Sequence, residues 1–233
     1  DSFRTISNSN PLTSFEVSLK LRFAYLERFL ETTFYRTSLG SSYPIGEINI
    51  TQGFSGILKS SYNYTKVNAS ISDYMNVPPF GNISWLVYGG KTFGILPYTL
   101  LDIAPGNELH YYNKYAFNMM NRWEFIHDQY AGINFEHNVG NGIFRLFPKL
   151  RFRQFWTAKA LWGTLSEENK SLNFKTGHGF QSLDGNTYLE LGTGIDNIFR
   201  VFRIDFVWRV FPSTLKKVND KSFGIFGSFR VGF

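Results

Sequence analysis

Residues that could carry out catalysis or bind a metal are few in this chain, and their spacing keeps them apart. Glu124, His127 and Asp128 lie close together in the sequence, and on a helix they could form a ligand set. On a strand, where side chains alternate between two faces, His127 points away from both carboxylates. A metal ion needs ligands that converge on one point. The sequence therefore predicts no metal site here.

The common signatures of covalent and nucleotide chemistry are also missing. The chain has no cysteine, and no serine stands in a Gly-x-Ser-x-Gly turn, which removes the commoner hydrolase nucleophiles. Gly89-Gly90-Lys91-Thr92 looks like half of a phosphate-binding loop, but Trp85 occupies the position of the first glycine of that motif. We therefore predict that the protein is not an enzyme and uses no cofactor.

Charged residues at every second position of apolar segments form the strongest pattern in the chain. This period of two is that of a β-strand, so charged and apolar side chains face opposite sides of a sheet. The charges predicted to face the interior of a barrel are Arg22, Glu124, Arg153, Glu190, Arg203, Asp205, Arg209 and Arg230. The side chains predicted to face lipid are Phe202, Phe206, Trp208, Phe229 and Phe233. The interior charges either pair across strands and fill the lumen, or line a water-filled path.

The elements that must position these side chains are strands. The chain contains 25 Phe, 13 Tyr and 5 Trp, but no stretch approaches the roughly 20 consecutive apolar residues of a membrane helix. Aromatic residues in alternating segments are typical of outer-membrane barrels, in which every second side chain faces lipid. The predicted fold class is all-β, an antiparallel transmembrane β-barrel or the C-terminal segment of a larger one. A soluble β-sandwich with an aromatic core is the alternative.

About ten strands are expected, most of them near ten residues long. They cover residues 15–25, 28–37, 58–73, 82–93, 109–118, 122–136, 152–162, 188–195, 201–210 and 223–233. A turn lies either near His127, within the sixth of these, or before it at 118–121, and the sequence leaves both open. Residues 196–198 predict a tight hairpin. If the C-terminal Phe lies at the periplasm, 140–150 and 196–199 become periplasmic turns, and 166–184 and 212–222 become extracellular loops.

Two resemblances suggest a location. The ending FGIFGSFRVGF resembles the C-terminal signal of bacterial outer-membrane β-barrels. The segments that carry the second resemblance are Gly90 to Tyr98, Leu100-Leu101 with Pro105-Gly106-Asn107, Phe117 to Asn121 with Glu124-Phe125 and Asp128-Gln129-Tyr130, and Tyr188 to Phe199. They are similar to the Bacteroidota outer-membrane proteins that carry a carboxypeptidase-regulatory-like domain ahead of a barrel of unknown function. That family implies a barrel and no reaction.

These observations predict one outer-membrane β-barrel region over residues 1–233, a scaffold or accessory component of an envelope assembly. A passive or gated transport channel is the alternative, and an outer-membrane enzyme with a rim site is a distant one. Because the chain starts at Asp1 without Met or a signal peptide, we expect a mature form or a C-terminal fragment. The net charge of +6 is spread at strand spacing, so no nucleic acid partner is expected.

The expected partners are outer-membrane lipid, and other envelope proteins or missing strands of the same protein. The first strand, 15–25, must either pair with the closing strand, 223–233, or meet other strands, because an open edge is not tolerated in lipid. The family resemblance favours other strands.

Overall fold

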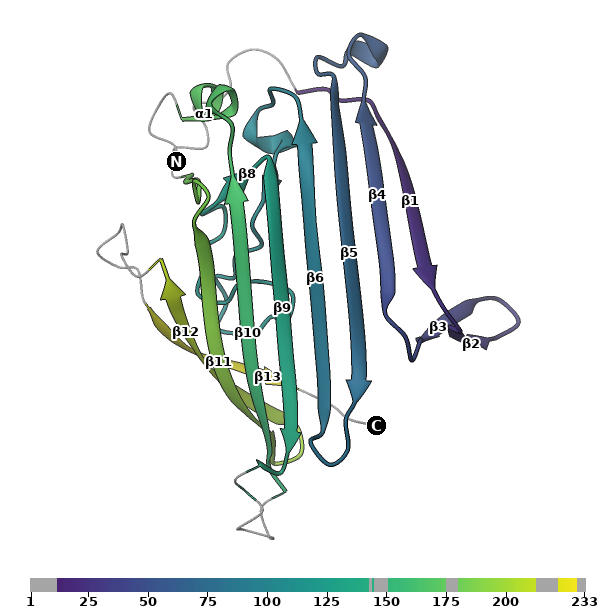
Figure 1. The fold of residues 1–233 in the computed structure, drawn as a ribbon, viewed down its shortest axis with the longest axis vertical. Coiled ribbons are helices and arrows are strands. Elements are labelled where there is room, and N and C mark those ends of the chain that lie inside the picture. The colour runs from purple at the N-terminus through teal and green to yellow at the C-terminus, as the bar shows by residue number, and fades with distance from the viewer. Residues whose placement is uncertain (1–11, 143, 145–150, 175–179, 213–221, 230–233) are drawn as a thin grey trace.

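Nine antiparallel strands form one sheet in the computed structural model, which describes residues 12–142, 144, 151–174, 180–212 and 222–229 (Figure 1). The strand order is β1-β4-β5-β6-β9-β10-β11-β12-β13. Their bounds are β1 (Glu16–Ala24), β4 (Ile45–Gly53), β5 (Tyr64–Asn76), β6 (Asn82–Phe93), β9 (Gln129–Gly140), β10 (Arg153–Thr164), β11 (Thr187–Ile198), β12 (Phe202–Phe211) and β13 (Phe223–Phe229). The prediction of a mainly antiparallel β structure is confirmed.

Short elements lie in the connections between these strands. They are the hairpin of β2 (Arg28–Glu31) and β3 (Arg36–Gly40), the 3₁₀ helices η2 (Ile57–Lys59) and η3 (Tyr98–Leu100), the pair β7 (Asp102–Ile103) and β8 (Ile126–His127), and α1 (Glu167–Asn173). None of the helices in the described residues has the length and apolar character needed to span a bilayer.

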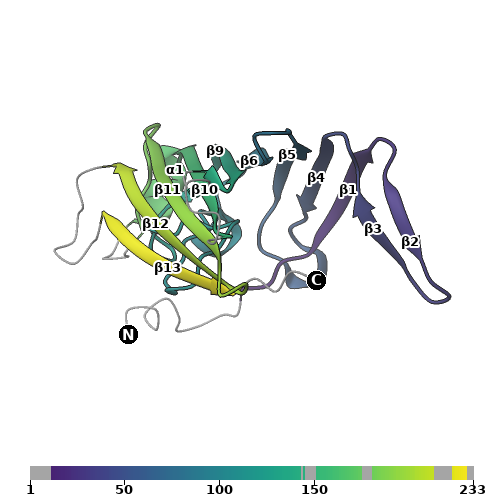
Figure 2. The ribbon, with the colours of Figure 1, turned by 90° about the horizontal axis from the view of Figure 1, so that it is seen from below.

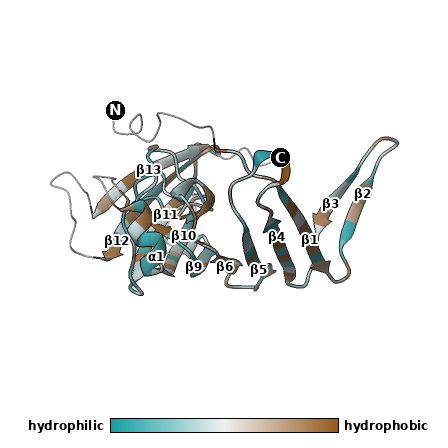
Figure 3. Cartoon of the chain, turned by 90° about the horizontal axis from the view of Figure 1, so that it is seen from above, coloured by the Kyte–Doolittle hydropathy of each residue, from teal (hydrophilic) through white to brown (hydrophobic). Residues whose placement is uncertain are grey.

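The alternation of side chains explains the two faces of the sheet. In β1 and β4, Leu19 lies opposite Ile50 on one face, and Arg22 lies opposite Glu47 on the other. Figure 3 shows the resulting hydrophobic and hydrophilic bands along these strands. The sheet curves strongly from β9 to β13 and opens out toward β1 (Figure 2). The concave face carries most of the charged side chains, and from β10 to β13 it also carries buried apolar ones such as Leu161 and Val207.

The sheet is not closed within the described residues. In that part of the chain β1 pairs with β4 and β13 pairs with β12, and no backbone hydrogen bond joins β1 to β13. The free edge of β13 instead meets the connection between β6 and β9. The Gly227 amide donates to the carbonyl of His110 at 2.9 Å, and the Tyr112 amide donates to the carbonyl of Gly227 at 3.1 Å.

Several segments differ from the predictions, and the predicted strand 58–73 begins only at Tyr64. Residues 28–37 form a hairpin beside the main sheet and not one of its strands. Residues 109–118 contain no strand, although Tyr111 makes an isolated bridge to Gly227. The predicted strand 122–136 starts only at Gln129, so Glu124 belongs to the preceding connection. Strand β11 continues through 196–198, and the turn follows at 199–201. Strand β4 was not predicted.

The pairing of β9 with β10 contains one irregularity, because Val139 of β9 is an extra residue between two paired positions. The pairing of β10 with β9 shifts register between Gln154 and Phe155, where the sequence pattern is also interrupted. Phe155 is fully buried on the concave side, and the Arg203 guanidinium carbon lies 4.0 Å from the centre of its ring. Phe155 lies on this side through the regular alternation that it shares with Thr157 and Lys159, and its ring gives a buried cation an aromatic surface.

Candidate functional site

The connection between β6 and β9, residues 94–128, folds inward and lies within the curve of β9 to β13 (Figure 2). Its side chains form the hydrophobic core together with side chains of the wall. Phe117, Met120 and Phe125 of the connection cluster with Leu161 and Tyr188, which project from β10 and β11. We call residues 94–128 the inner connection. It covers much of the concave face that a pore would need.

Glu190 on β11 holds the backbone of the inner connection. Its carboxylate accepts hydrogen bonds from the amides of Asn118 at 2.9 Å and Met119 at 2.6 Å. It also accepts one from the Tyr188 hydroxyl at 2.7 Å. The Glu190 side chain is fully buried, so these three bonds replace water as its donors. The predicted interior charge thus binds protein backbone.

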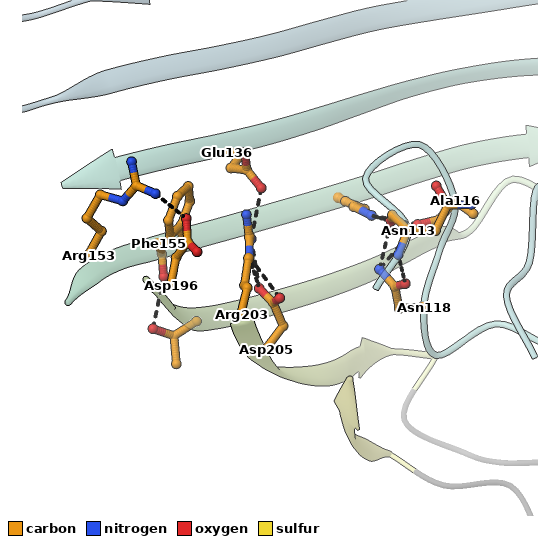
Figure 4. A network of polar contacts seen from close by, with 11 residues as sticks. Asn113, Ala116, Asn118, Glu136, Arg153, Phe155, Asp196, Arg203 and Asp205 are labelled. Atoms are coloured by element: carbon orange, nitrogen blue, oxygen red, sulfur yellow. Dashed lines mark hydrogen bonds and ion pairs between the residues drawn. The ribbon is translucent and has the colours of Figure 1, made fainter. Parts of the chain in front are cut away.

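Lys159 on β10 lies directly opposite Glu190 and binds the same stretch of chain. Its ammonium donates to the carbonyl of Asn113 at 2.7 Å and to that of Ala116 at 2.6 Å. Figure 4 shows these bonds beside the loop that carries Asn113, Ala116 and Asn118. The lysine binds carbonyls and the glutamate binds amides, so the pair recognises both kinds of backbone group in residues 113–119.

A third contact joins the inner connection to β12. The Arg209 guanidinium donates to the Glu124 carboxylate at 2.8 Å, with both side chains buried. The guanidinium carbon also lies 4.8 Å from the ring centre of Tyr188. Glu124 was predicted to face the interior from a strand. It does lie inside, but it reaches there from the loop, and its partner is another of the predicted interior charges.

Arg203 forms the centre of a second buried cluster nearer the β11–β12 turn (Figure 4). It contacts Glu136 at 2.9 Å and Asp205 at 2.7 Å, and its guanidinium carbon lies 4.8 Å from the Tyr112 ring centre. Arg203 and Asp205 are only 4% and 1% exposed. The two carboxylates neutralise the buried arginine, and Tyr112 brings the inner connection into this cluster.

The remaining predicted interior charges lie at the periphery. Arg153 contacts the buried Asp196 at 2.9 Å. Arg22 is more exposed and contacts Glu27 and Glu47. Arg230 lies outside the described residues. Seven of the eight predicted charges are therefore placed, and six of them, all but Arg22, belong to β9–β12 or to the inner connection packed on it.

The residues predicted to face lipid lie on the convex side where they are described. In β12, Phe202 and Trp208 are about 40% exposed, while the alternate residues Arg203 and Asp205 are buried. Phe206 is half-buried between neighbouring strands, and Phe229 on β13 is exposed. Phe233 lies outside the described residues. The separation of the two faces matches the predicted register.

Helix α1 binds the first residues of the inner connection, 94–98. The Asn169 side chain bonds the amide of Leu96 and the carbonyl of Gly94, and Asn173 bonds the amide of Tyr98 and the carbonyl of Leu96. Both asparagines are buried. The helix lies where a loop, 166–184, is predicted from the sequence, and the pattern of residues there predicts no role for either asparagine. Their spacing of four, which places them on one face of a helix, was the available signal.

The candidate trio Glu124, His127 and Asp128 does not form one site. Glu124 binds Arg209, and Asp128 accepts hydrogen bonds from the Ser166 amide and the Asn169 side chain. His127 is buried against the Tyr130 ring, and burial lowers its pKa to about 4. Across the described residues, no group of three or more His, Asp or Glu side chains is placed to hold a metal ion.

Comparisons with known proteins give a family without a described function. No curated protein and no solved structure matches the chain. A family model, described as the C-terminal domain of a family of unknown function, DUF5686, matches residues 3–175. The match includes β1 to β10 and the whole inner connection, and it ends before β11. On this match the chain belongs to the DUF5686 family, through its C-terminal domain.

Proposed function

We propose that this chain is a membrane-spanning wall of an outer-membrane β-barrel and that it acts as a scaffold for an envelope assembly. The observation that carries the proposal is the apolar convex face, which runs across all nine strands of the main sheet. Its exposed members include Val17, Leu19, Leu21, Phe23, Ile50, Ile71, Val87, Ile133, Trp156, Leu191, Ile204, Trp208 and Ile225. An exposed apolar surface of this extent needs a covering, and lipid covers every strand at once.

The lengths of the strands support the same proposal. Most strands of the main sheet contain 9 to 13 residues, and a tilted strand of about 9 to 11 residues spans the hydrocarbon layer. The concave face carries most of the charges of the main sheet, as the interior of a barrel does, and the convex exceptions Asp73 and Lys91 lie near strand ends. Location in a bacterial outer membrane, and the Bacteroidota proteins that the sequence resembles, are part of this proposal.

A scaffold is favoured over an open channel by the inner connection. It packs a hydrophobic core against β10 and β11 and binds three buried charges of the wall. A conducting path would need these charges to face water. Charges that are used to bind backbone and to pair with one another indicate a filled interior in this part of the wall.

Transport is the second candidate, because the concave face of β1, β4 and β5 differs from that of β9–β13. Lys20 and Glu47 form an ion pair at 3.0 Å there, with side chains 60% and 34% exposed, and Lys66 also belongs to this face. These groups are accessible to water in the described part of the molecule. A path along this side of the lumen would be lined by charges of both signs.

One experiment separates the candidates. The full-length protein is extracted from its own membrane with mild detergent, and the components that co-purify are identified and quantified. Partners in fixed stoichiometry support the scaffold, whereas a lone protein that conducts ions in a planar bilayer supports transport. A chain that stays monodisperse without detergent and migrates identically on gels with and without heating refutes the barrel itself.

A further inference from the structure

A cavity of about 300 Å³ lies between the inner connection and the wall, and neither candidate function uses it. The inner faces of β5, β6 and β9 form one side, and residues 112–115 of the inner connection form the other. Its lining includes Tyr74, Leu86, Tyr112, Tyr115, Asn134 and Lys159. The volume is at the lower end of the range of about 300 to 1,000 Å³ that small-molecule sites occupy.

Asn134 supplies an observation that points to a ligand. Its side chain is 9% exposed, it lines the cavity, and its Oδ1 atom has no hydrogen-bond partner among the described residues. A buried carbonyl oxygen without a donor is costly, and most such groups in folded proteins are satisfied. A donor from a molecule within the cavity would satisfy it.

The polar groups around Asn134 are held in place by other contacts. Lys159, opposite Asn134 in the sheet, donates to two backbone carbonyls, which leaves the third N–H of its ammonium for another acceptor. Glu136 also lines the cavity, and one of its oxygens is bound to Arg203. Fixed donors and acceptors on rigid strands favour selective binding, because the side chains lose little conformational freedom when a ligand binds.

Tyrosines supply the rest of the surface. Tyr43, Tyr74, Tyr112 and Tyr115 all line the cavity, and Tyr112 is the buried one. Each presents an apolar ring with a polar hydroxyl. Serines from β5 and β6, Ser72 and Ser84, add hydroxyls to the same cavity. Rings beside hydroxyl, amide and ammonium groups match a ligand with C–H faces and many hydroxyls.

From this combination we propose that the cavity is a binding site for a small saccharide of one or two sugar units. The sugar would stack on Tyr74 or Tyr115, donate a hydroxyl to Asn134 Oδ1 and accept from Lys159. A purely apolar ligand would leave Asn134 Oδ1 without a donor and the third N–H of Lys159 without an acceptor. The proposal does not depend on the scaffold role.

The test uses the full-length protein in detergent, titrated by calorimetry with glucose, galactose, N-acetylglucosamine, maltose and lactose as probes. We expect at least one probe to bind, and we expect Asn134→Leu to weaken it by roughly tenfold, because one buried hydrogen bond is lost. Tyr74→Ala, at an exposed position on the cavity, should also weaken binding. Tyr35→Ala removes an equally exposed tyrosine outside the cavity and should leave binding unchanged.

Folding of each variant is checked by its migration on gels before and after heating. The Tyr74 variant keeps the test valid if the Asn134 variant does not fold, because Tyr74 is 61% exposed and makes little core contact. The proposal is overturned if none of the probes binds, which would leave ordered water as the partner of Asn134. It is also overturned if binding is unaffected by the folded variants, or is lost equally in Tyr35→Ala.

Discussion

Replacing Glu190 by glutamine should release the inner connection from the wall while the strands stay paired. The carboxylate accepts two backbone amides and one hydroxyl, and it lies opposite the buried Lys159. Glutamine keeps the shape but offers one acceptor oxygen in place of two, so an amide of Asn118 or Met119 loses its partner. The buried ammonium of Lys159 also loses one of the carboxylates that lie near it, while Glu136 and Asp205 remain.

The magnitude follows from these contacts. A hydrogen bond to a charged group contributes about 1.5 to 3 kcal/mol, and leaving a buried amide without its acceptor costs about 1 to 3 kcal/mol more. We therefore expect the free energy of opening of residues 113–119 to fall by about 4 kcal/mol. Since each 1.4 kcal/mol is a factor of ten, the protected amides there should exchange roughly a thousandfold faster.

Hydrogen exchange of the full-length protein in detergent, read by mass spectrometry, measures this change. Glu47→Gln is the matched control, because Glu47 is also an inward glutamate with cationic partners but is partly exposed, where an ion pair contributes about 0 to 1 kcal/mol. Equal exchange of residues 113–119 in the two variants would refute the reasoning. So would faster exchange spread over β10 and β11 as well, since that would mean that Glu190 stabilises the sheet and not the connection.

Three further predictions test the faces and the buried charges. Phe206→Arg should impair membrane insertion by about 2 to 4 kcal/mol if the site lies near the midplane, measured as the folded fraction in lipid vesicles, and an unchanged fraction would contradict the lipid assignment. Arg203→Leu should insert but destabilise the folded state by about 3 to 5 kcal/mol in urea titration, because Glu136 and Asp205 stay buried without their cation; a neutral effect would show that water reaches the cluster. His127 should make the inner connection sensitive to acid. Burial lowers its pKa to about 4, against about 6.5 in an unfolded chain, so the folded state requires the neutral ring. About 3 kcal/mol of folding stability is therefore fully present above pH 6.5 and is lost as the pH falls toward 4. Hydrogen exchange of residues 102–127 at pH 7 and pH 5 reads this out, after correction for intrinsic rates, and His127→Gln should remove the difference.

Local patterning was enough to predict the faces of the strands but not the contacts of their charges. In β12 the alternation of Phe202, Arg203, Ile204 and Asp205 is enough to predict which face each side chain occupies, because successive side chains of a strand point to opposite faces. That signal says nothing of whether the concave face meets water or protein. The partners of Glu190 are backbone amides 71 and 72 residues away. No residue type marks a backbone amide, so the sequence could not distinguish an anchor from a lumen charge.

The segment 109–118 shows why a strand was predicted where none forms. Leu109, Tyr111 and Tyr115 stand at every second position except Asn113, but all three side chains are exposed, and Tyr112 between them is buried. Its polar groups are satisfied by side chains and not by a ladder, since Asn118 bonds Asn107 and the amide of Asn113. Asparagine competes in this way for backbone groups, which favours turns over strands. Strand β4 is the opposite case, since a strand forms there and none is predicted. Ile48 and Ile50 alternate with Glu47 and Asn49, which is the pattern of a strand with two different faces.

The two edges of the sheet indicate how the proposed wall is completed. An unpaired strand edge is costly in lipid, since its amides and carbonyls have no donor or acceptor there. The edge of β13 is partly protected, because the inner connection bonds both backbone groups of Gly227. In the described residues, the edge of β1 has no such cover along Glu16–Ala24. If the sheet spans a membrane, β1 is therefore the edge that most requires another strand. A strand paired there would extend the accessible polar face of β1, β4 and β5. Any lumen of the assembled barrel would lie on that side, while the side of β9–β13 stays filled by the inner connection.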